Sequence, residues 1–201
     1  IGTGGVGQLI AVAVDLDDIA EAFGQVIDAK SPYTGGHSER VGHYAVLIGA
    51  ELGLDGAHCR QLRRAAMLHD VGKLGVSSAI LEKPGKLDAE EWRTMQSHAA
   101  LTAHILGRIS MMADMAMIAG AHHERLDGTG YPLQLDARMI SLDTRIISVA
   151  DFFDALTADR PYRKAMPVDV ALSIMAQEVG TGIDAMCFAA LNAIIAREAA
   201  S

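Results

Sequence analysis

Aromatic residues, cysteine and proline are all scarce in this sequence. Only 4% of its 201 residues are aromatic, whereas 50% are hydrophobic, and Ala, Leu, Ile and Met supply most of the latter. Strands favour aromatic and β-branched side chains, and helices favour Ala, Leu and Met, so this composition favours helices packed on helices. The only β-like run, 145–149, lies within helical periodicity. We therefore predict an all-α fold with seven or more helices.

The two cysteines, Cys59 and Cys187, lie far apart in the sequence and show no framework spacing. We predict reduced thiols in the core, as is usual for a cytosolic domain. Asp114 and Asn192 interrupt the longest apolar stretches, so neither stretch is long enough to span a membrane. The chain has no basic segment followed by a cleavage site. We expect a cytoplasmic fragment of a longer signalling protein.

The chain is acidic, with a formal net charge of −8. Because a phosphate backbone requires a basic face, we expect no DNA partner. A small phosphate ligand remains compatible with this charge, since bound metals would neutralise several carboxylates. Cations also occur within the motifs described below, at Lys73, Arg160, Arg163 and Lys164.

The N-terminus is rich in glycine, and residues 2–7 match the G-x-G-x-x-G dinucleotide-binding pattern. We reject that interpretation, because the pattern requires a preceding strand and a βαβ unit. We predict that residues 1–7 are a linker or a frayed end and that a single domain follows. Helices are expected over about 8–29, 37–52, 58–68, 88–109, 112–123, 143–158, 168–179 and 184–198, with an irregular segment over about 127–141.

A His69-Asp70 pair lies in the run Met67 to Lys73, and other metal-ligand residue types lie in motifs on both sides of it. The candidate ligands are His37, His69, Asp70, His98, His122, His123 and Asp151. Imidazole and carboxylate together suit iron, manganese or zinc. Five histidines and two aspartates are enough to hold two divalent ions that share a carboxylate.

Asp70 is the candidate for the shared carboxylate, because a carboxylate has two oxygens and can bridge two cations, which an imidazole cannot. Adjacent residues of a helix point about 100° apart, so His69 and Asp70 can reach one ion only near a helix end. Gly72 supplies such an end. His43, His58 and His104 fall outside the motifs, and we expect them to be structural.

These motifs, in this order, resemble the HD-GYP family, the bacterial cyclic-dinucleotide phosphodiesterases of the HD phosphohydrolase superfamily. The resemblance runs from about Phe23 to at least Met166 and implies an HD-type helical bundle, so we assign residues 8–201 to an HD-GYP domain with an N-terminal helix. Besides His69-Asp70, it rests on Gly72-Lys73, His122 to Arg125, Asp127-Gly128, Gly130 to Pro132 and Arg160 to Arg163.

The resemblance implies two ligand sets that share Asp70. The first set is His37, His69, Asp70 and Asp151, and the second is Asp70, His98, His122 and His123. Two divalent cations, iron or manganese with zinc as an alternative, would lower the pKa of a bridging water and hold a phosphodiester for in-line attack by the resulting hydroxide. Asp70, as the carboxylate shared by both ions, is a catalytic candidate, and so is Lys73, for the reason given next.

Substrate contacts are expected from Lys73 and from two further motifs. Lys73 can reach a phosphate oxygen and stabilise charge in the transition state. The resemblance implies that Arg160 and Arg163 grip the second phosphate and that Tyr131 contacts the ligand. Asp127 is expected to hold the glycine-rich loop. Asp154 is expected to support a ligand or to lie on a helix face, and Arg40 to pair with a carboxylate of the bundle.

The sequence departs from the family at two places. Some members use a glutamate four residues before the first motif histidine to hold a third metal, and Tyr33 stands there in this chain. A phenol, with a pKa of about 10, is a weak ligand at neutral pH. We therefore expect two ions and a product that stops mainly at the linear dinucleotide. In the second departure, residues 133–141 lack the glycines and the proline common after Gly-Tyr-Pro.

We predict a metal-dependent phosphodiesterase that converts cyclic di-GMP to linear pGpG or on to GMP. One alternative is an HD hydrolase of another, mixed cyclic dinucleotide. A second is a signalling module that binds the dinucleotide or a protein without turnover. A sensor or receiver domain in the parent chain and diguanylate cyclase (GGDEF) proteins are further expected partners.

Overall fold

The computed structural model describes residues 15–30, 35–159 and 164–200. The elements in chain order are α1 Leu16–Ala29, α2 His37–Glu51, α3 Gly56–Leu68, the 3-10 helix η1 Val71–Gly75, α4 Ser78–Leu81, α5 Ala89–Gly107, the 3-10 helix η2 Ser110–Met112, α6 Ala113–Gly120, α7 Leu142–Thr157, α8 Val168–Gln177 and α9 Ala185–Ala199. Over these residues the only β-type pairings are two isolated bridges. The all-α prediction is confirmed.

Side-chain caps explain where several helices begin. Asp15, Asp55, Ser141 and Asp184 each accept hydrogen bonds from backbone N–H groups in the first turn of the helix that follows. At α5 the cap Asp88 belongs to a full capping box with Glu91. These caps satisfy N–H groups that have no partner inside the helix, and carboxylates there also oppose the positive end of the helix dipole.

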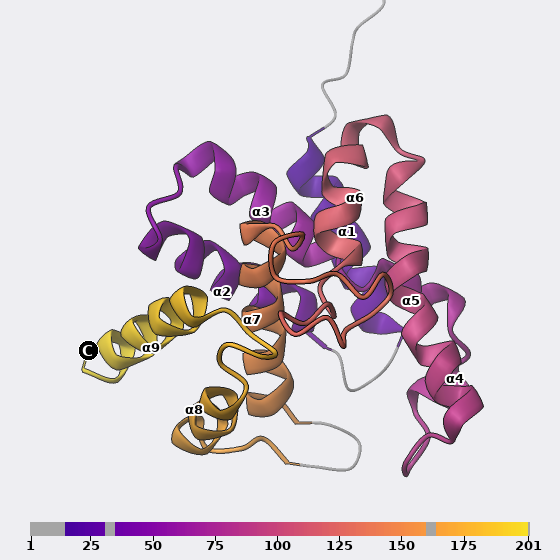
Figure 1. The fold of residues 1–201 in the computed structure, drawn as a ribbon. Helices are drawn as coiled ribbons and strands as arrows, with labels where there is room; N and C mark the ends of the chain where they lie inside the picture. The colour runs from indigo at the N-terminus through magenta and orange to yellow at the C-terminus, as the bar shows by residue number, and fades with distance from the viewer. Residues whose placement is uncertain (1–14, 31–34, 160–163, 201) are drawn as a thin grey trace, which may run out of the picture.

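Helix α7 runs through the middle of the bundle (Figure 1). It packs against α2, α8, α9 and α6, while α3 packs against α1 and α2, and α5 against α6 and η1. Ile146, Ile147 and Phe153 of α7 are buried in one core with Met67 of α3 and Leu106 of α5. Burying such side chains stabilises a fold by about 1.5–3 kcal/mol each. Helices α2 and α3 thus pack directly on α7, and α5 is joined to it through α6.

Three local predictions need correction. The expected helix over 112–123 ends at Gly120, so His122 and His123 lie in the turn after α6. The expected break at Gly72 is itself a short 3-10 helix, and α4 was not predicted. The prediction for residues 1–7 and the first part of the 8–29 helix lie outside the described residues.

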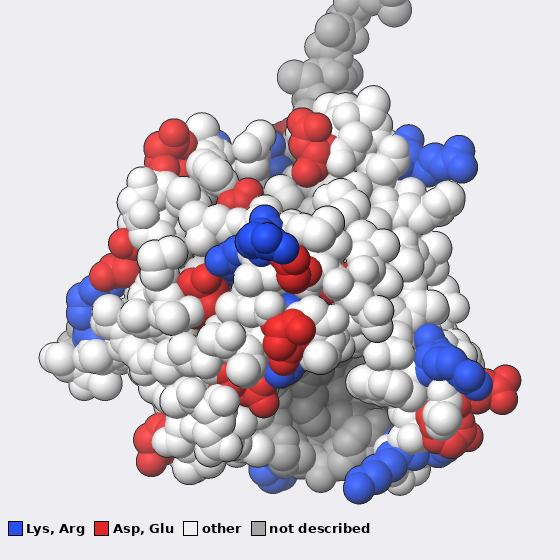
Figure 2. Space-filling view, viewed as in Figure 1, with Lys and Arg blue, Asp and Glu red and all other residues white. Residues whose placement is uncertain are grey.

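Among the described helices, none is long and apolar enough to cross a membrane. Figure 2 shows acidic and basic side chains interspersed over one face of the domain. The described residues of that face form no continuous basic patch.

Candidate metal centre

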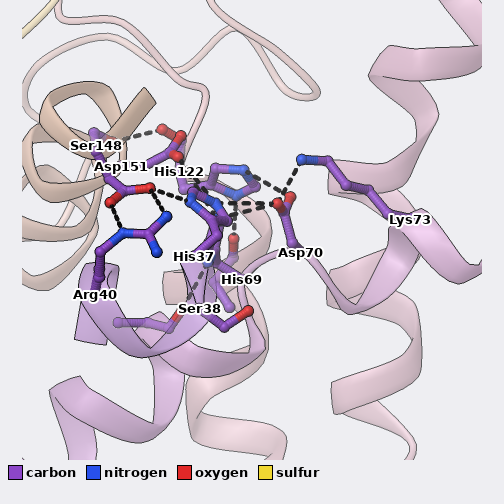
Figure 3. Close-up of polar contacts among 12 residues, drawn as sticks. His37, Ser38, Arg40, His69, Asp70, Lys73, His122, Ser148 and Asp151 are labelled. Carbon is purple, nitrogen blue, oxygen red and sulfur yellow. Dashed lines mark hydrogen bonds and ion pairs between the residues drawn. The ribbon is translucent and has the colours of Figure 1, made fainter. Parts of the chain in front are cut away.

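The structure brings all seven predicted metal-ligand residues together, from five parts of the chain. His37 is the first residue of α2, His69 and Asp70 directly follow α3, His98 lies in α5, His122 and His123 follow α6, and Asp151 lies in α7. Figure 3 shows Asp70 between the histidines on one side and Lys73 on the other. Residues up to 114 positions apart in sequence, such as His37 and Asp151, therefore meet in one buried site.

Asp70 is buried between two groups of histidines, and each group faces a different carboxylate oxygen. Oδ2 lies 3.5 Å from Nε2 of His37 and 3.4 Å from Nε2 of His69. Oδ1 lies 3.4 Å from Nε2 of His98 and 3.8 Å from Nε2 of His122. This is the arrangement that a carboxylate shared by two cations requires.

Asp151 completes the group around His37. Its Oδ1 lies 3.4 Å from Nε2 of His37 and 3.8 Å from Nε2 of His69. The potential metal ligands form three groups, and within each group the ligand atoms lie within 4.8 Å of one another. The groups are His37, His69 and Asp70; His98, His122 and His123; and His69, His122 and Asp151. The third group overlaps the other two, so the donors form one continuous centre.

Backbone contacts set the tautomers of three of the histidines. Nδ1 of His69, His98 and His122 each lies 2.6 Å from the carbonyl oxygen three residues earlier. A carbonyl only accepts, so Nδ1 carries the hydrogen and the Nε2 lone pair points to the centre. Such contacts orient histidine ligands in metal sites generally.

Three polar atoms at the centre are buried without a hydrogen-bond partner: Nε2 of His37, Nε2 of His69 and Oδ1 of Asp70. Buried polar atoms without partners cost about 1–3 kcal/mol each and are rare in folded proteins. A divalent cation would satisfy such electron pairs, so the residues fit a metal. The buried histidine and aspartate clusters are consistent with the metal centre of an HD domain.

Charge and burial set the protonation of the site without metal. Burial, helped by the nearby His69, lowers the pKa of His122 to about 3, and burial also lowers the pKa of His98 and His123. Burial opposes ionisation of Asp70, yet Lys73 and His69 hold its pKa well below the usual value. Neutral imidazoles and an ionised carboxylate are the forms that bind metal.

His37 has a raised pKa because of a carboxylate outside the ligand set. Burial acts to lower its pKa, but the hydrogen bond to Asp154 and the nearby negative charges of Asp70 and Asp151 outweigh burial and raise it to about 9. Nδ1 of His37 lies 2.7 Å from Oδ2 of Asp154. Arg40 donates to both oxygens of this carboxylate, to Oδ1 at 2.5 Å and to Oδ2 at 3.1 Å. The expected supporting role of Asp154 and the expected carboxylate partner of Arg40 are both confirmed.

Two predicted substrate contacts lie at the edge of the centre. Nζ of Lys73 is 2.5 Å from Oδ2 of Asp70, so its charge lies beside the shared carboxylate. The Tyr131 ring lies 4.8 Å from the His123 ring, between centroids. Burial raises the pKa of Tyr131, so its hydroxyl stays protonated and can donate. Arg160, Arg163 and Tyr33 lie outside the described residues.

Two acidic residues hold the loop that carries Tyr131. Hydrogen bonds from Thr129 and Arg125 lower the pKa of Asp127 to about 2, which confirms its expected role in the loop. Glu124 was missed: it is buried and accepts from the backbone N–H groups of Leu133, at 2.6 Å, and Leu135, at 2.9 Å. The sequence signal that could have identified Glu124 is its position directly after His122 and His123.

The residues expected to be structural lie elsewhere. His58 pairs with Asp143 at 2.8 Å, His43 packs on Tyr44, and His104 is exposed on α5. Cys59 and Cys187 are buried and unpaired with each other, as predicted.

A family model described as "HD domain" matches residues 21–186. The chain belongs to the HD domain family, and its relatives confirm the resemblance to HD-GYP proteins. It is 60% identical over 177 residues to "3'3'-cGAMP-specific phosphodiesterase 3" of Vibrio cholerae, covering 88% of this chain and 38% of the relative. It is 38% identical over 169 residues to "Cyclic di-GMP phosphodiesterase response regulator RpfG" of Xanthomonas campestris, covering 83% of this chain and 45% of that protein. The chain therefore spans less than half the length of these relatives.

Solved structures agree with the fold. The crystal structure of a cyclic GMP-AMP-specific phosphodiesterase of V. cholerae (V-cGAP3) matches with a TM-score of 0.59 and 54% identity, over 90% of this chain and 42% of that one. Bd1817, an HDG"Y"P protein from Bdellovibrio bacteriovorus, matches with a TM-score of 0.68 over 90% of this chain and 63% of that one. Its identity of 19% shows a common fold alone.

Proposed function

We propose that this chain hydrolyses a phosphodiester bond of a cyclic dinucleotide with the help of two divalent metal ions. The observation that carries the proposal is the position of Asp70, whose two oxygens face two different groups of histidines. The HD-GYP relatives, several of which are named as cyclic dinucleotide phosphodiesterases, support the substrate class.

The proposed ligands divide as the sequence implies. The first ion would be held by His37, His69, Asp70 and Asp151, and the second by Asp70, His98, His122 and His123. When bound, the two ions supply an activated water and neutralise charge on the phosphate. The donors are imidazoles and carboxylates, which suit iron, manganese and zinc; as the resemblance implies, iron or manganese is the proposed metal, with zinc as the alternative.

Residues around the ligands would position the substrate. Lys73 offers an ammonium beside Asp70, where it can contact a phosphate oxygen and stabilise developing charge. Tyr131 offers a protonated hydroxyl at the edge of the centre. Arg160 and Arg163 remain proposed contacts to the second phosphate.

The comparisons favour the mixed dinucleotide over cyclic di-GMP. The relative that is 60% identical is named for 3'3'-cGAMP, whereas relatives named for cyclic di-GMP are 34% to 38% identical. We therefore propose 3'3'-cGAMP as the preferred substrate and the linear dinucleotide as the main product. A cytoplasmic location and a regulatory domain in the parent chain remain expectations.

The test is turnover by protein purified without oxygen and loaded with iron or manganese. We expect a higher kcat/KM for 3'3'-cGAMP than for cyclic di-GMP, with the product identified by mass spectrometry. A preference for cyclic di-GMP would reverse the substrate assignment. Tight dinucleotide binding without turnover by fully metal-loaded protein would instead support the signalling module. His58→Ala, which alters a histidine outside the centre, is the matched control.

A further inference from the structure

Trp92, the only tryptophan of the chain, lies on α5 with 48% of its surface exposed. Isolated exposed apolar residues are normal on protein surfaces and need no explanation. Trp92 differs from the others because it lies at one end of a row of aromatic contacts that reaches the candidate metal centre. Its exposed indole is thus next to the place where the proposed substrate would bind.

The row runs from Trp92 through Tyr131 to two proposed metal ligands. The ring centroids of Trp92 and Tyr131 are 6.5 Å apart, with the ring planes at 78°. Tyr131 in turn lies 4.8 Å from the His123 ring and 6.4 Å from the His98 ring. Tyr131 is the only ring that contacts Trp92 within the described part of the chain. This edge-type contact does not stack a parallel ring on the indole.

The backbone under Trp92 is held firmly. Its N–H donates to the carbonyl of Asp88 at 2.9 Å, in the first turn of α5. That turn is closed by the capping box of Asp88 and Glu91, and Lys83 binds the Glu91 carboxylate at 2.5 Å. A rigid aromatic side chain loses little conformational entropy when a ligand covers it, so such residues make effective binding surfaces.

A cyclic dinucleotide carries two bases on either side of its phosphodiester ring. With one phosphodiester at the metal centre, a base that extends past Tyr131 reaches the exposed indole of Trp92. Base–aromatic stacking contributes about 1–3 kcal/mol per base and accepts every base, because each base has a π-face. An indole at the rim can therefore add affinity without selecting adenine or guanine.

We propose that Trp92 stacks on one nucleobase of the bound cyclic dinucleotide, an inference that rests on the proposed function. Trp92 is then a binding residue, separate from the metal chemistry. It contributes affinity for 3'3'-cGAMP and cyclic di-GMP alike, and the choice between them is made elsewhere.

Steady-state kinetics of metal-loaded variants test the proposal. Trp92→Ala should raise KM for both dinucleotides roughly 5- to 150-fold, the range that corresponds to one lost stacking contact, with little change in kcat. Trp92→Phe should recover much of the loss, because a ring is restored. Met186→Ala removes a large apolar side chain that is 62% exposed on α9 and should leave KM unchanged.

Fluorescence provides a second readout, since no other tryptophan contributes. On rapid mixing of metal-loaded wild type with 3'3'-cGAMP, the emission should be quenched and should recover as substrate is consumed. If KM is unchanged in Trp92→Ala, or if a wild type that turns over shows no fluorescence change, the proposed role of Trp92 is wrong and the proposed function still stands. Metal loss or a large drop in kcat in Trp92→Ala would show that the residue supports the centre, and would also overturn it. A metal-loaded wild type without turnover or binding of either dinucleotide overturns the proposed function and this inference together.

Discussion

Four histidines of the centre obtain their Nδ1 partners in two different ways. His69, His98 and His122 use carbonyls three residues earlier in the chain, which are local partners. His37 uses the carboxylate of Asp154, which is 117 residues away in the sequence. Residue type and motif order were therefore enough to predict which residues would meet at the candidate centre. They could suggest that Asp154 supports a ligand, but not which one.

Asp154→Asn should weaken metal binding at the His37 side of the centre. The amide keeps the shape of the carboxylate but loses the charge that holds His37 and Arg40. Loss of such a partner typically lowers metal affinity about 10- to 100-fold. Competition with a chelator of known affinity measures the change. Asp143→Asn is the matched control, because Asp143 also lies on α7 and pairs with a histidine, His58 of α3, away from the centre. Equal loss in both variants would contradict the assignment.

Asp70→Ala should remove metal from both sites, whereas Asp151→Ala should mainly affect one. The reason is that the Asp70 carboxylate lies within 4 Å of both histidine groups, whereas Asp151 lies that close only to His37 and His69 and is farther from His122. Elemental analysis should find less than half of the wild-type metal in Asp70→Ala, and turnover should be undetectable. His43→Ala should retain normal metal content. A second ion retained at full occupancy in Asp70→Ala would show that the carboxylate is not shared.

At the scale of elements, packing rather than local pattern decides where helices end. The sequence around Gly120 continues a helical pattern into His122, yet α6 stops at Gly120. A Cβ at Gly120 would lie 2.6 Å from Cβ of Ala103 and 3.1 Å from the Ala99 carbonyl, so this end of α6 is pressed against α5. Such a contact is invisible to periodicity, which explains why the existence of the helices was predicted better than their ends.

Gly72→Ala should push η1, which directly follows Asp70, away from α5, which carries His98. A Cβ at Gly72 would overlap the backbone oxygen of His98 and lie 2.7 Å from the Thr102 nitrogen, so η1 would have to move away from α5. Overpacking of this kind costs about 1–3 kcal/mol, and it would also move Asp70 away from His98. Urea unfolding should show the loss of stability, and metal analysis the weakened second site.

Gly56→Ala is the control for that experiment. Gly56 begins α3, and a Cβ there would meet nothing closer than 3.9 Å. Alanine is also the better helix former, so this variant should be neutral or slightly more stable. Normal stability and metal content in Gly72→Ala would show that η1 and α5 can separate without disturbing the centre.

At the scale of the whole molecule, the candidate centre joins α2, the end of α3, α5, the turn after α6 and α7. The composition predicted that these would be helices, and the motifs predicted that their polar residues would meet. Neither the composition nor the motifs could place Trp92 beside Tyr131, or show that Glu124 holds the loop that carries Tyr131. Those contacts depend on how α5 and the loop after α6 pack.

Metal should therefore act as a cross-link of the whole fold. A ligand that binds only the folded state at 100 times its Kd adds about 2.7 kcal/mol of stability. For a domain of this size 1 kcal/mol shifts Tm by about 2–4 °C, so removal of one such ion by a chelator should lower Tm by roughly 5–10 °C. Differential scanning calorimetry with and without chelator measures the shift.

Asp70→Ala should make that shift disappear. Without the shared carboxylate, the histidine groups lose the anion that lies between them, and added metal should no longer raise Tm. His58→Ala should keep the full shift, because His58 pairs with Asp143 outside the centre. If Asp70→Ala were stabilised by metal as strongly as the wild type, the cation would bind elsewhere, for example at acidic surface groups, and the five elements would not be joined through Asp70.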